Sequence, residues 1–276
     1  MLFRDFIFNY KSCLICLIKK KNFFTFGKRI LLLPYKYILS NLTDFLKNIN
    51  IDKQFSLENK SLDDLFKYFD CDKSSLVHGY SKFYLQELEK FKDSKINILE
   101  FGIHFGSSQA ALSKYFSKAN IIGVDKNPYF KKFYSKKIRS LYCDVSDRNS
   151  LKFLRDYLNT ELDVIIDDAS HIPEHQLLTF IETFDLLKSK GIYVVEELDI
   201  FESFPENYNT HLKIESSELR NFLHHLNNQN IQNINKHINN HEILSKINKI
   251  EWVKIFRGNY EINGKNVSEI AFIKKI

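Results

Sequence analysis

From residue 96 onward, short apolar runs alternate with segments in which apolar positions recur every three or four residues. Short apolar runs predict buried strands, and the periodic segments between them predict amphipathic helices. Five strands are expected on this basis, at residues 96–102, 120–126, 140–147, 162–168 and 191–198. Helices are expected between them, for example over 107–116, 151–158 and 171–188. This alternation predicts a doubly wound α/β domain with a parallel sheet.

Near the C-terminus, two further apolar runs, at 251–258 and 268–275, flank an Asn263-Gly264 turn signal. Runs joined in this way predict an antiparallel pair. The expected fold is therefore a mostly parallel seven-stranded sheet with helices on both faces, which is the Rossmann-like architecture of class I methyltransferases. Between the fifth strand and this pair, residues 205–250 are expected to form an inserted helical or flap region. Part of that region is rich in asparagine, and a biased nucleotide composition of the genome could account for these asparagines.

The first 60 residues differ in character, and we expect them to form a basic, apolar, helical extension before a main domain at 61–276. Lysines and arginines crowd residues 1–40 between two apolar clusters. Neither cluster reaches the roughly 20 residues that span a bilayer, and no signal-peptide cleavage pattern follows them. Two alternatives remain: packing on the chain's own domain or on a second subunit of a homo-oligomer, and peripheral membrane contact. Packing is favoured.

Composition sets broader limits. A chain of 276 residues with 44% hydrophobic composition can bury one full α/β core and still carry extensions. The net charge of +6 could attract phosphate groups or an anionic surface, but it does not indicate nucleic-acid binding. Four cysteines without a paired framework suit a reducing cytoplasm. Membrane contact through residues 1–40 would place the chain at the inner face of the membrane. For Cys13 and Cys16, a plain buried or interface role is favoured over zinc binding.

The first predicted strand ends in a glycine loop that carries candidate cofactor residues. Gly102, Gly106 and Ser107 follow it, where glycine allows a tight turn and a close approach to a ligand. The nicotinamide fingerprint G-x-G-x-x-G is absent because position 104 is histidine. Glu100 before the first glycine makes an acid-x-Gly pattern that resembles the first motif of S-adenosylmethionine-dependent methyltransferases.

That resemblance implies a role for three acids at successive strand ends. Glu100 would serve the methionyl portion of the cofactor, Asp125 would accept both ribose hydroxyls, and Asp144 would lie beside the adenine. An acid in such a place is often a helix cap instead, and for Asp144 the two interpretations stay open.

The fourth and fifth strands both end in acidic residues. Asp167 and Asp168 follow one, and Glu196 and Glu197 end the other, so the carboxyl ends of the parallel strands should bring these carboxylates into one crevice. Gathered carboxylates repel unless a cation holds them, and oxygen ligands suit magnesium. His171 beside such a metal could take a proton from a polarised hydroxyl.

A purely structural interpretation of the same stretch is that Ser170 caps the following helix, with Pro173 in its first turn. Both interpretations can hold at once. For His175 a helix-surface or packing role is favoured.

Together these residues resemble the metal-dependent sugar O-methyltransferases of macrolide biosynthesis, the mycinamicin and macrocin type, and their relatives in bacterial polysaccharide clusters. The resemblance rests on D-D-x-S-H at 167–171, on the acidic pair 28 residues after Asp168, and on the segment at 70–88 before the first strand. It implies that Asp168, Glu196 and Glu197 hold magnesium and that His171 is the general base. It also implies that Tyr80 and His78 line the cofactor or substrate site, and that Asp167 contacts the cofactor.

Two departures from the family pattern affect the metal. Ala169 replaces a glycine, and Glu197 stands where the family has aspartate, so the longer acid could weaken or shift coordination. The acceptor pocket cannot be carried over.

The expected function is S-adenosylmethionine-dependent O-methylation, assisted by magnesium, of a sugar hydroxyl. The acceptor would be a nucleotide-sugar, a surface polysaccharide precursor or a glycosylated small molecule. Two alternatives are a methyltransferase acting on RNA, protein or a phosphorus-containing group, and a non-catalytic scaffold on the same fold. No N-P-P-Y-type amine-methylation motif follows the fourth strand, and no nucleic-acid partner is expected.

Overall fold

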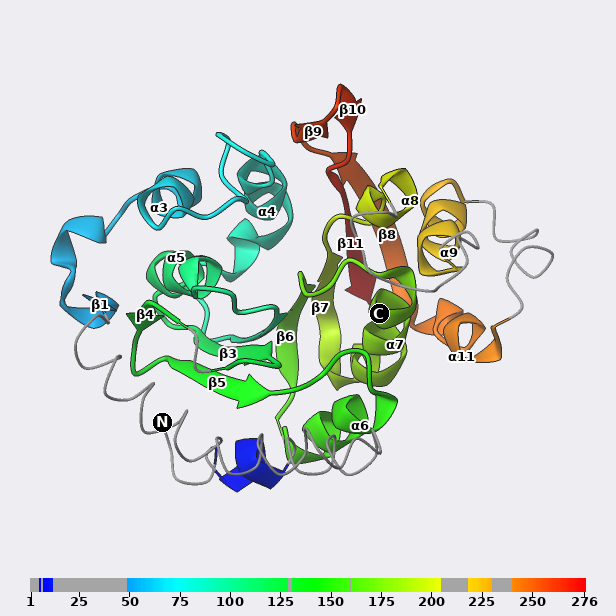
Figure 1. The fold of residues 1–276 in the computed structure, drawn as a ribbon, viewed down its shortest axis with the longest axis horizontal. Coiled ribbons are helices and arrows are strands. Elements are labelled where there is room, and N and C mark those ends of the chain that lie inside the picture. Colours follow the sequence, from blue (N-terminus) through cyan, green and yellow to red (C-terminus); the bar gives the residue numbers. More distant parts are fainter. Residues whose placement is uncertain are drawn as a thin grey trace, which may run out of the picture.

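The computed structural model describes residues 5, 7–11, 49–128, 131–158, 160–204, 218–229 and 240–276. Its centre is a seven-stranded sheet in the order β5-β3-β2-β6-β7-β11-β8 (Figure 1). These strands are β2 (Asn97–Phe101), β3 (Asn120–Asp125), β5 (Ile138–Tyr142), β6 (Leu162–Asp167), β7 (Leu187–Val195), β8 (Ile250–Arg257) and β11 (Glu269–Lys275). The first five are parallel, and β11 is antiparallel to both β7 and β8. The predicted seven-stranded sheet is confirmed.

Helices cover both faces of this sheet (Figure 1). One face carries α3 (Leu62–Tyr68), α4 (Ser81–Leu88) and α5 (Ser107–Tyr115). The other carries α6 (Arg148–Tyr157), α7 (Pro173–Thr183) and α9 (Glu218–Asn227). The remaining short helices are α8 (Ile200–Ser203), α11 (His241–Leu244) and 3₁₀ turns at Ile51–Lys53, Phe55–Leu57, Glu89–Phe91, Phe184–Leu186 and Ile247–Lys249. Two short strands, β1 (Ile49–Asn50) and β4 (Phe133–Tyr134), pair outside the main sheet.

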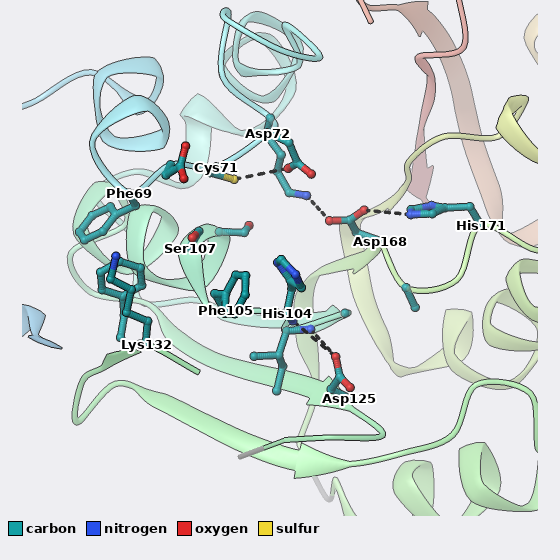
Figure 2. A pocket seen from close by; sticks show the side chains of 17 residues that line it. Phe69, Cys71, Asp72, His104, Phe105, Ser107, Asp125, Lys132, Asp168 and His171 are labelled. Carbon is teal, nitrogen blue, oxygen red and sulfur yellow. Dashed lines mark hydrogen bonds and ion pairs between the residues drawn. The ribbon is translucent and has the colours of Figure 1, made fainter. Parts of the chain in front are cut away.

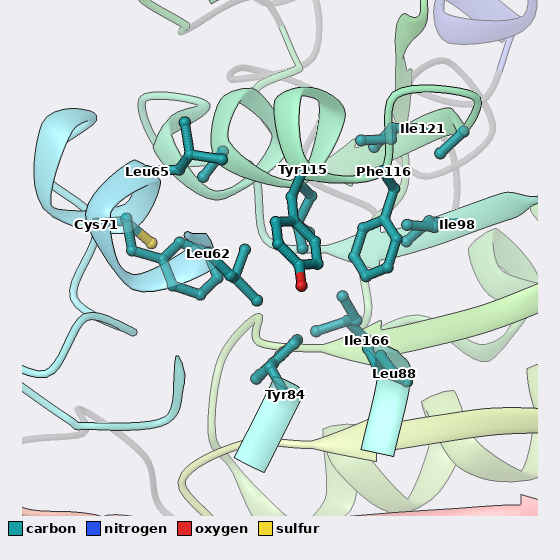
Figure 3. Packing of buried hydrophobic residues seen from close by; sticks show 14 of the residues in the cluster. Leu62, Leu65, Cys71, Tyr84, Leu88, Ile98, Tyr115, Phe116, Ile121 and Ile166 are labelled. Carbon is teal, nitrogen blue, oxygen red and sulfur yellow. The ribbon is translucent and has the colours of Figure 1, made fainter. Parts of the chain in front are cut away.

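The two cores follow from the alternation of side chains along each strand. In β6, Ile165 packs in the core under α6 and α7, whereas Val164 and Ile166 pack in the core under α3, α4 and α5. Figure 3 shows the second core, where Ile166 meets Tyr84 and Leu88 of α4. Successive strand residues point to opposite faces. This period of two therefore also decides to which side the acidic residues at the strand ends project.

Two of the predicted helices are confirmed by α5 and α6, and the third is shorter than expected. The helix α7 ends at Thr183, and Leu187 already pairs with Leu162 as the first residue of β7. The prediction that Ser170 caps α7 is wrong, because the N-cap residue is Ile172 and its side chain makes no capping bond. Pro173 does occupy the first turn, where its missing N–H is not needed.

The Asn263-Gly264 turn is confirmed, but it closes a small hairpin of its own. Strands β9 (Glu261–Ile262) and β10 (Lys265–Asn266) pair across it beyond the end of β8. Both turn residues have positive φ, 51° and 76°, as the tight hairpin turn with an Asn-Gly centre requires. Within the predicted inserted region, α9 and α11 are helical, and residues 205–217 and 230–239 lie outside the described residues. That these residues form an inserted flap remains a prediction.

Six of the first 40 residues are described, and among them Asp5, Phe8 and Asn9 are buried against the domain. Phe8 is buried and stacks on Phe153 and Tyr157 of α6, with ring centroids 5.1 and 4.0 Å away. Asp5 forms an ion pair with Arg139 of β5 at 2.6 Å. These contacts agree with the favoured packing interpretation, which remains a prediction for the extension. Most of the predicted extension, with Cys13 and Cys16, lies outside the described part of the chain.

Asparagine side chains also lie along the outer strands of the sheet. The Asn9 amide donates to Ser140 O (3.3 Å) and accepts from Tyr142 N (2.7 Å) on β5. At the opposite edge, the Asn227 side-chain oxygen accepts from Ile255 N of β8 at 3.2 Å. Within the part of the chain that is described, no helix has the length and apolar character needed to cross a bilayer.

Candidate active site

A pocket of about 600 Å³ opens at the carboxyl ends of β2, β3 and β6 (Figure 2). The glycine loop after β2 forms one wall, and the connection between α3 and α4 forms another. The lining includes one glycine, Gly102, and several ionisable residues: Asp72, Lys73, Asp125, Asp168 and His171. Of the four acids that were predicted to share one crevice, Asp168 lines this pocket, whereas Asp167, Glu196 and Glu197 are not among its lining residues.

The glycine loop is shaped by two residues in the left-handed region of backbone space. Gly102 has φ of 92°, and a Cβ atom there would lie 2.0 Å from the backbone oxygen of Asp168. Only glycine lets the ends of β2 and β6 come this close. Gly106 (φ 82°) is the N-cap residue of α5, and the next residue, Ser107, lines the pocket. His104 between the glycines also has a positive φ of 45°.

Asp125 ends β3 and lines the pocket, as predicted. Its carboxylate accepts from the backbone N–H of Ile103 at 3.0 Å and of Asn127 at 2.7 Å. Each carboxylate oxygen has further acceptor capacity, so Asp125 can still receive hydroxyl donors from a ligand. Asp144 is not among the lining residues, and its carboxylate accepts from Ser146 N at 3.1 Å.

The helix-cap interpretation of Asp144 is wrong, because Asp147 caps α6. Its predicted adenine contact remains a prediction.

Two buried carboxylates, Glu100 and Glu196, and the partly exposed Asp168 project from adjacent strands to the α4 side of the sheet. Glu100 on β2 lies on the same face as Ile98, and Asp168 and Glu196 continue the alternation that places Ile166 and Val194 there. Lys73, from the connection between α3 and α4, reaches down to meet them.

The Lys73 ammonium joins these carboxylates. It contacts Asp168 Oδ2, lies 2.9 Å from Glu196 Oε2, and is 4.0 Å from Glu100 Oε1. Tyr84 of α4 donates its hydroxyl to the other oxygen of Glu196. Sequence reasoning missed Lys73, although it lies in the segment at 70–88 that carries the family resemblance.

Burial and charge oppose each other in this cluster. Burial alone would lower the pKa of Lys73, but Asp168 and Glu196 outweigh it and hold the pKa well above its usual value. Burial raises the pKa of Glu100 to about 7, although Lys73 pulls it the other way. The pKa values of Asp168 and Glu196 are also raised by burial, against the influence of Lys73. A charged Lys73 is therefore what keeps this acidic cluster stable in the fold.

Glu197 pairs with two histidines rather than with the other acids. Its carboxylate lies 3.0 Å from His78 Nε2 and 3.2 Å from His171 Nε2. Burial would raise its pKa, but His171 and His78 lower it to about 2. Glu197 and His171 both have positive φ, 53° and 55°. Backbone strain of this kind clusters at functional sites.

One ring nitrogen of His171 has a charged partner, and the other has no hydrogen-bond partner among the described residues. Nε2 faces Glu197 and lies 3.9 Å from Asp168, whereas Nδ1 is buried with no hydrogen-bond partner among the described residues. Figure 2 shows His171 beside Asp168 at the edge of the pocket. His175, for which a helix-surface or packing role was favoured, is half-buried on α7 and has its Nδ1 2.8 Å from Ser170 Oγ.

Three predicted cofactor residues are buried away from the pocket wall. Asp167 faces the opposite core, next to Tyr193, and burial raises its pKa to about 7. Glu100 lies beneath the glycine loop, bonded to Gln109 of α5. Tyr80 is fully buried and stacks on His78 with centroids 5.0 Å apart. The structure therefore does not bring these three to the pocket, and their predicted cofactor contacts remain predictions.

The expected repulsion among the carboxylates is relieved by the chain's own cations. Among the described residues, no group of three or more His, Cys, Asp or Glu side chains is arranged to hold a metal ion. Asp168 and Glu196 share Lys73, and Glu197 shares two histidines. The oxygen donors have the chemistry that magnesium prefers. For all three to act as ligands, however, Lys73 has to give up its two carboxylates.

Comparison with solved structures identifies the fold. The MycE methyltransferase of the mycinamycin pathway, solved in complex with Mg and SAH, superposes with a TM-score of 0.59. It is 17% identical, and the match covers 78% of this chain and 54% of that one. The chain has the class I methyltransferase fold. No protein-family model matches the sequence.

Sequence relatives of this class I chain are sugar O-methyltransferases. An 8-demethyl-8-alpha-L-rhamnosyl tetracenomycin-C 2'-O-methyltransferase of Streptomyces olivaceus is 30% identical over 129 residues, 44% of this chain and 34% of the relative. An L-olivosyl-oleandolide 3-O-methyltransferase of Streptomyces antibioticus is 32% identical over 162 residues, 55% of this chain and 40% of the relative. The chain thus spans less than half the length of these relatives.

Proposed function

We propose that this chain is an S-adenosylmethionine-dependent, magnesium-assisted O-methyltransferase that acts on a sugar hydroxyl. The acceptor belongs to a nucleotide-sugar, a surface polysaccharide precursor or a glycosylated small molecule. One observation carries the proposal: His171 stands at the pocket edge with Nε2 on Glu197 and a buried Nδ1 without a partner among the described residues. The names of the sequence relatives support a sugar as the acceptor class.

The pocket supports a cationic, ribose-bearing cofactor. Asp125 would hold the ribose hydroxyls, and Gly102 and Ser107 would border the cofactor along the loop. Acids exceed lysines on the pocket wall, where Asp70, Asp72, Asp125 and Asp168 face Lys73 and Lys132. When bound, S-adenosylmethionine would supply the electrophilic methyl group.

His171 would accept the proton of the acceptor hydroxyl at Nδ1. Glu197 would keep the remaining proton on Nε2 and stabilise the imidazolium that forms, because its carboxylate lies 3.2 Å from that nitrogen. When bound by Asp168, Glu196 and Glu197, magnesium would polarise the acceptor hydroxyl and lower its pKa. The longer Glu197, in place of the family's aspartate, reaches both histidines and would serve the base as well.

Transfer of a labelled methyl group tests this function on a panel of nucleotide-sugars, polysaccharide precursors and glycosylated small molecules. His171→Ala should lower turnover by about 10²–10⁴-fold, the usual contribution of a general base. Binding of S-adenosylhomocysteine, measured by calorimetry, should be unchanged. His175→Ala, four residues further along the chain, is the matched control and should keep most of the activity.

Full turnover in His171→Ala would refute the assignment of the base. Labelling of RNA, protein or a phosphorus-containing group instead of a sugar would favour the alternative acceptors. Failure to bind S-adenosylhomocysteine would favour a non-catalytic scaffold. Cytoplasmic location, membrane contact through residues 1–40 and homo-oligomer formation remain predictions.

A further inference from the structure

Lys73 is a fully buried lysine, so its charged group does not face solvent. Its side chain is 1% exposed, and its ammonium contacts the carboxylates of Asp168 and Glu196. Lysine is almost never fully buried unless it is paired, because removing an ammonium from water is costly. Both of its partners are proposed magnesium ligands. The structure therefore places a cation of the chain where an added cation would bind.

The two cations cannot share these carboxylates. Magnesium binds carboxylate oxygens at about 2.1 Å and requires near-octahedral geometry. An ammonium held 2.9 Å from Glu196 Oε2 occupies that oxygen's coordination space, and the other oxygen of Glu196 is held by Tyr84. Like charges a few Å apart in a site poor in water repel strongly. Metal binding therefore requires the ammonium to move.

The structure also offers a place to which it can move. Glu100 Oε1 has no hydrogen-bond partner among the described residues, is fully buried, and lies 4.0 Å from Lys73 Nζ. A shift of roughly 1 Å toward Glu100 would bring the two atoms to hydrogen-bond distance. Lysine has a flexible four-carbon stem, so such a shift needs no backbone movement.

We infer that Lys73 is the resident cation of this acidic cluster and that a divalent cation binds only by displacing its ammonium from Asp168 and Glu196 toward Glu100. This inference rests on the magnesium part of the proposed function. Without metal, Lys73 holds the carboxylates together and keeps the strand ends assembled. With metal, Lys73 neutralises Glu100 beneath the glycine loop. The competition with Lys73 thus sets the concentration of divalent cation at which the site becomes occupied.

Manganese binding, followed by titration calorimetry and by the electron paramagnetic resonance of free Mn²⁺, tests the competition without any assay of activity. Lys73→Gln should bind Mn²⁺ at least about tenfold more tightly than the unaltered protein, since breaking a buried ion pair leaves a charge that the metal can compensate. Lys246→Gln is the matched control. Lys246 is also buried and pairs with Asp185 at 2.8 Å, so its loss should leave the affinity unchanged.

Equal or weaker binding by Lys73→Gln would overturn the inference, as would an absence of Mn²⁺ binding in both proteins. A measurement on the unaltered protein covers the case in which Lys73→Gln does not fold. The ¹⁵N signal of the Lys73 ammonium, assigned by its loss in Lys73→Arg, should shift along the binding curve as Mg²⁺ is added. A signal that stays in place at saturating Mg²⁺ would also overturn the inference. Binding of S-adenosylhomocysteine is measured separately, so that failure here is distinguishable from failure of the proposed function.

Discussion

Gly102 lies where the ends of β2 and β6 come so close that there is no room for a side chain. In Gly102→Ala the new Cβ would lie 2.0 Å from Asp168 O and 2.8 Å from Asp168 C. Cβ contacts under 3.0 Å essentially do not occur, so the ends of β2 and β6 would have to separate by roughly 1 Å or more. Both contact atoms belong to the backbone, which cannot turn aside as a side chain can.

Two costs add in this variant. An L-residue forced to a positive φ costs about 1–2 kcal/mol, and an overpacked contact costs about 1–3 kcal/mol. We therefore expect Gly102→Ala to lose about 2–5 kcal/mol of unfolding free energy. Asp168 would be displaced by the same movement, so the affinity for S-adenosylhomocysteine should fall as well.

Gly264→Ala separates the two costs. Gly264 has a similar φ of 76°, but a Cβ there would have nothing within 4 Å. Its loss should be only the conformational cost, about 1–2 kcal/mol, with cofactor affinity unchanged. Urea unfolding of both variants measures the free energies, and calorimetry measures the binding. If Gly102→Ala is no less stable than Gly264→Ala and binds as well, the close contact between the strand ends is not real.

Three further outcomes are expected. Asp125→Ala should weaken S-adenosylmethionine binding in a calorimetric titration, whereas tighter binding of a nicotinamide nucleotide would show that the glycine loop has been misinterpreted. Phe8→Ala should cost about 3 kcal/mol in urea unfolding if the N-terminal residues pack in solution as in the structure, and an unchanged midpoint would argue against that packing. Burial would raise the pKa of Glu269, but hydrogen bonds from its histidine and arginine partners lower it to about 2 from a usual 4.5. Its stabilisation is therefore present above about pH 4.5 and is lost as the pH falls through 2, so Glu269→Gln should flatten the acid side of a stability–pH profile.

The sheet could be predicted because each of its strands corresponds to a short run of apolar residues in the sequence. The antiparallel pair could be predicted for the same reason, although the turn at Asn263 closes a smaller hairpin. The end of α7 could not, since Leu187 is apolar enough for either a helix or a strand. Its pairing with Leu162, a contact between distant residues, decides the matter.

The outline of the site was predictable, and the period of two along a strand adds one detail to it. Side chains alternate along a strand, so Asp167 must share the face of Ile165 and Asp168 that of Ile166. The period therefore places Asp168 on the face that also carries Glu100 and Glu196, while the predicted cofactor contact of Asp167 remains a prediction. Lys73 is different, since its partners are 95 and 123 residues away and no local pattern reveals them.

Two asparagine side chains occupy backbone groups at the two edges of the sheet. An outer strand exposes unpaired N–H and C=O groups on which another chain can add a strand. An amide carries the same donor and acceptor as a peptide bond, so Asn9 occupies one step of that template on β5, and Asn227 occupies an amide on β8. Among the many asparagines of this sequence, these two therefore act as one-residue substitutes for a neighbouring strand. Deamidation of Asn9 would replace the amide group that donates to Ser140 O with a carboxylate oxygen, which repels that carbonyl and removes the contact.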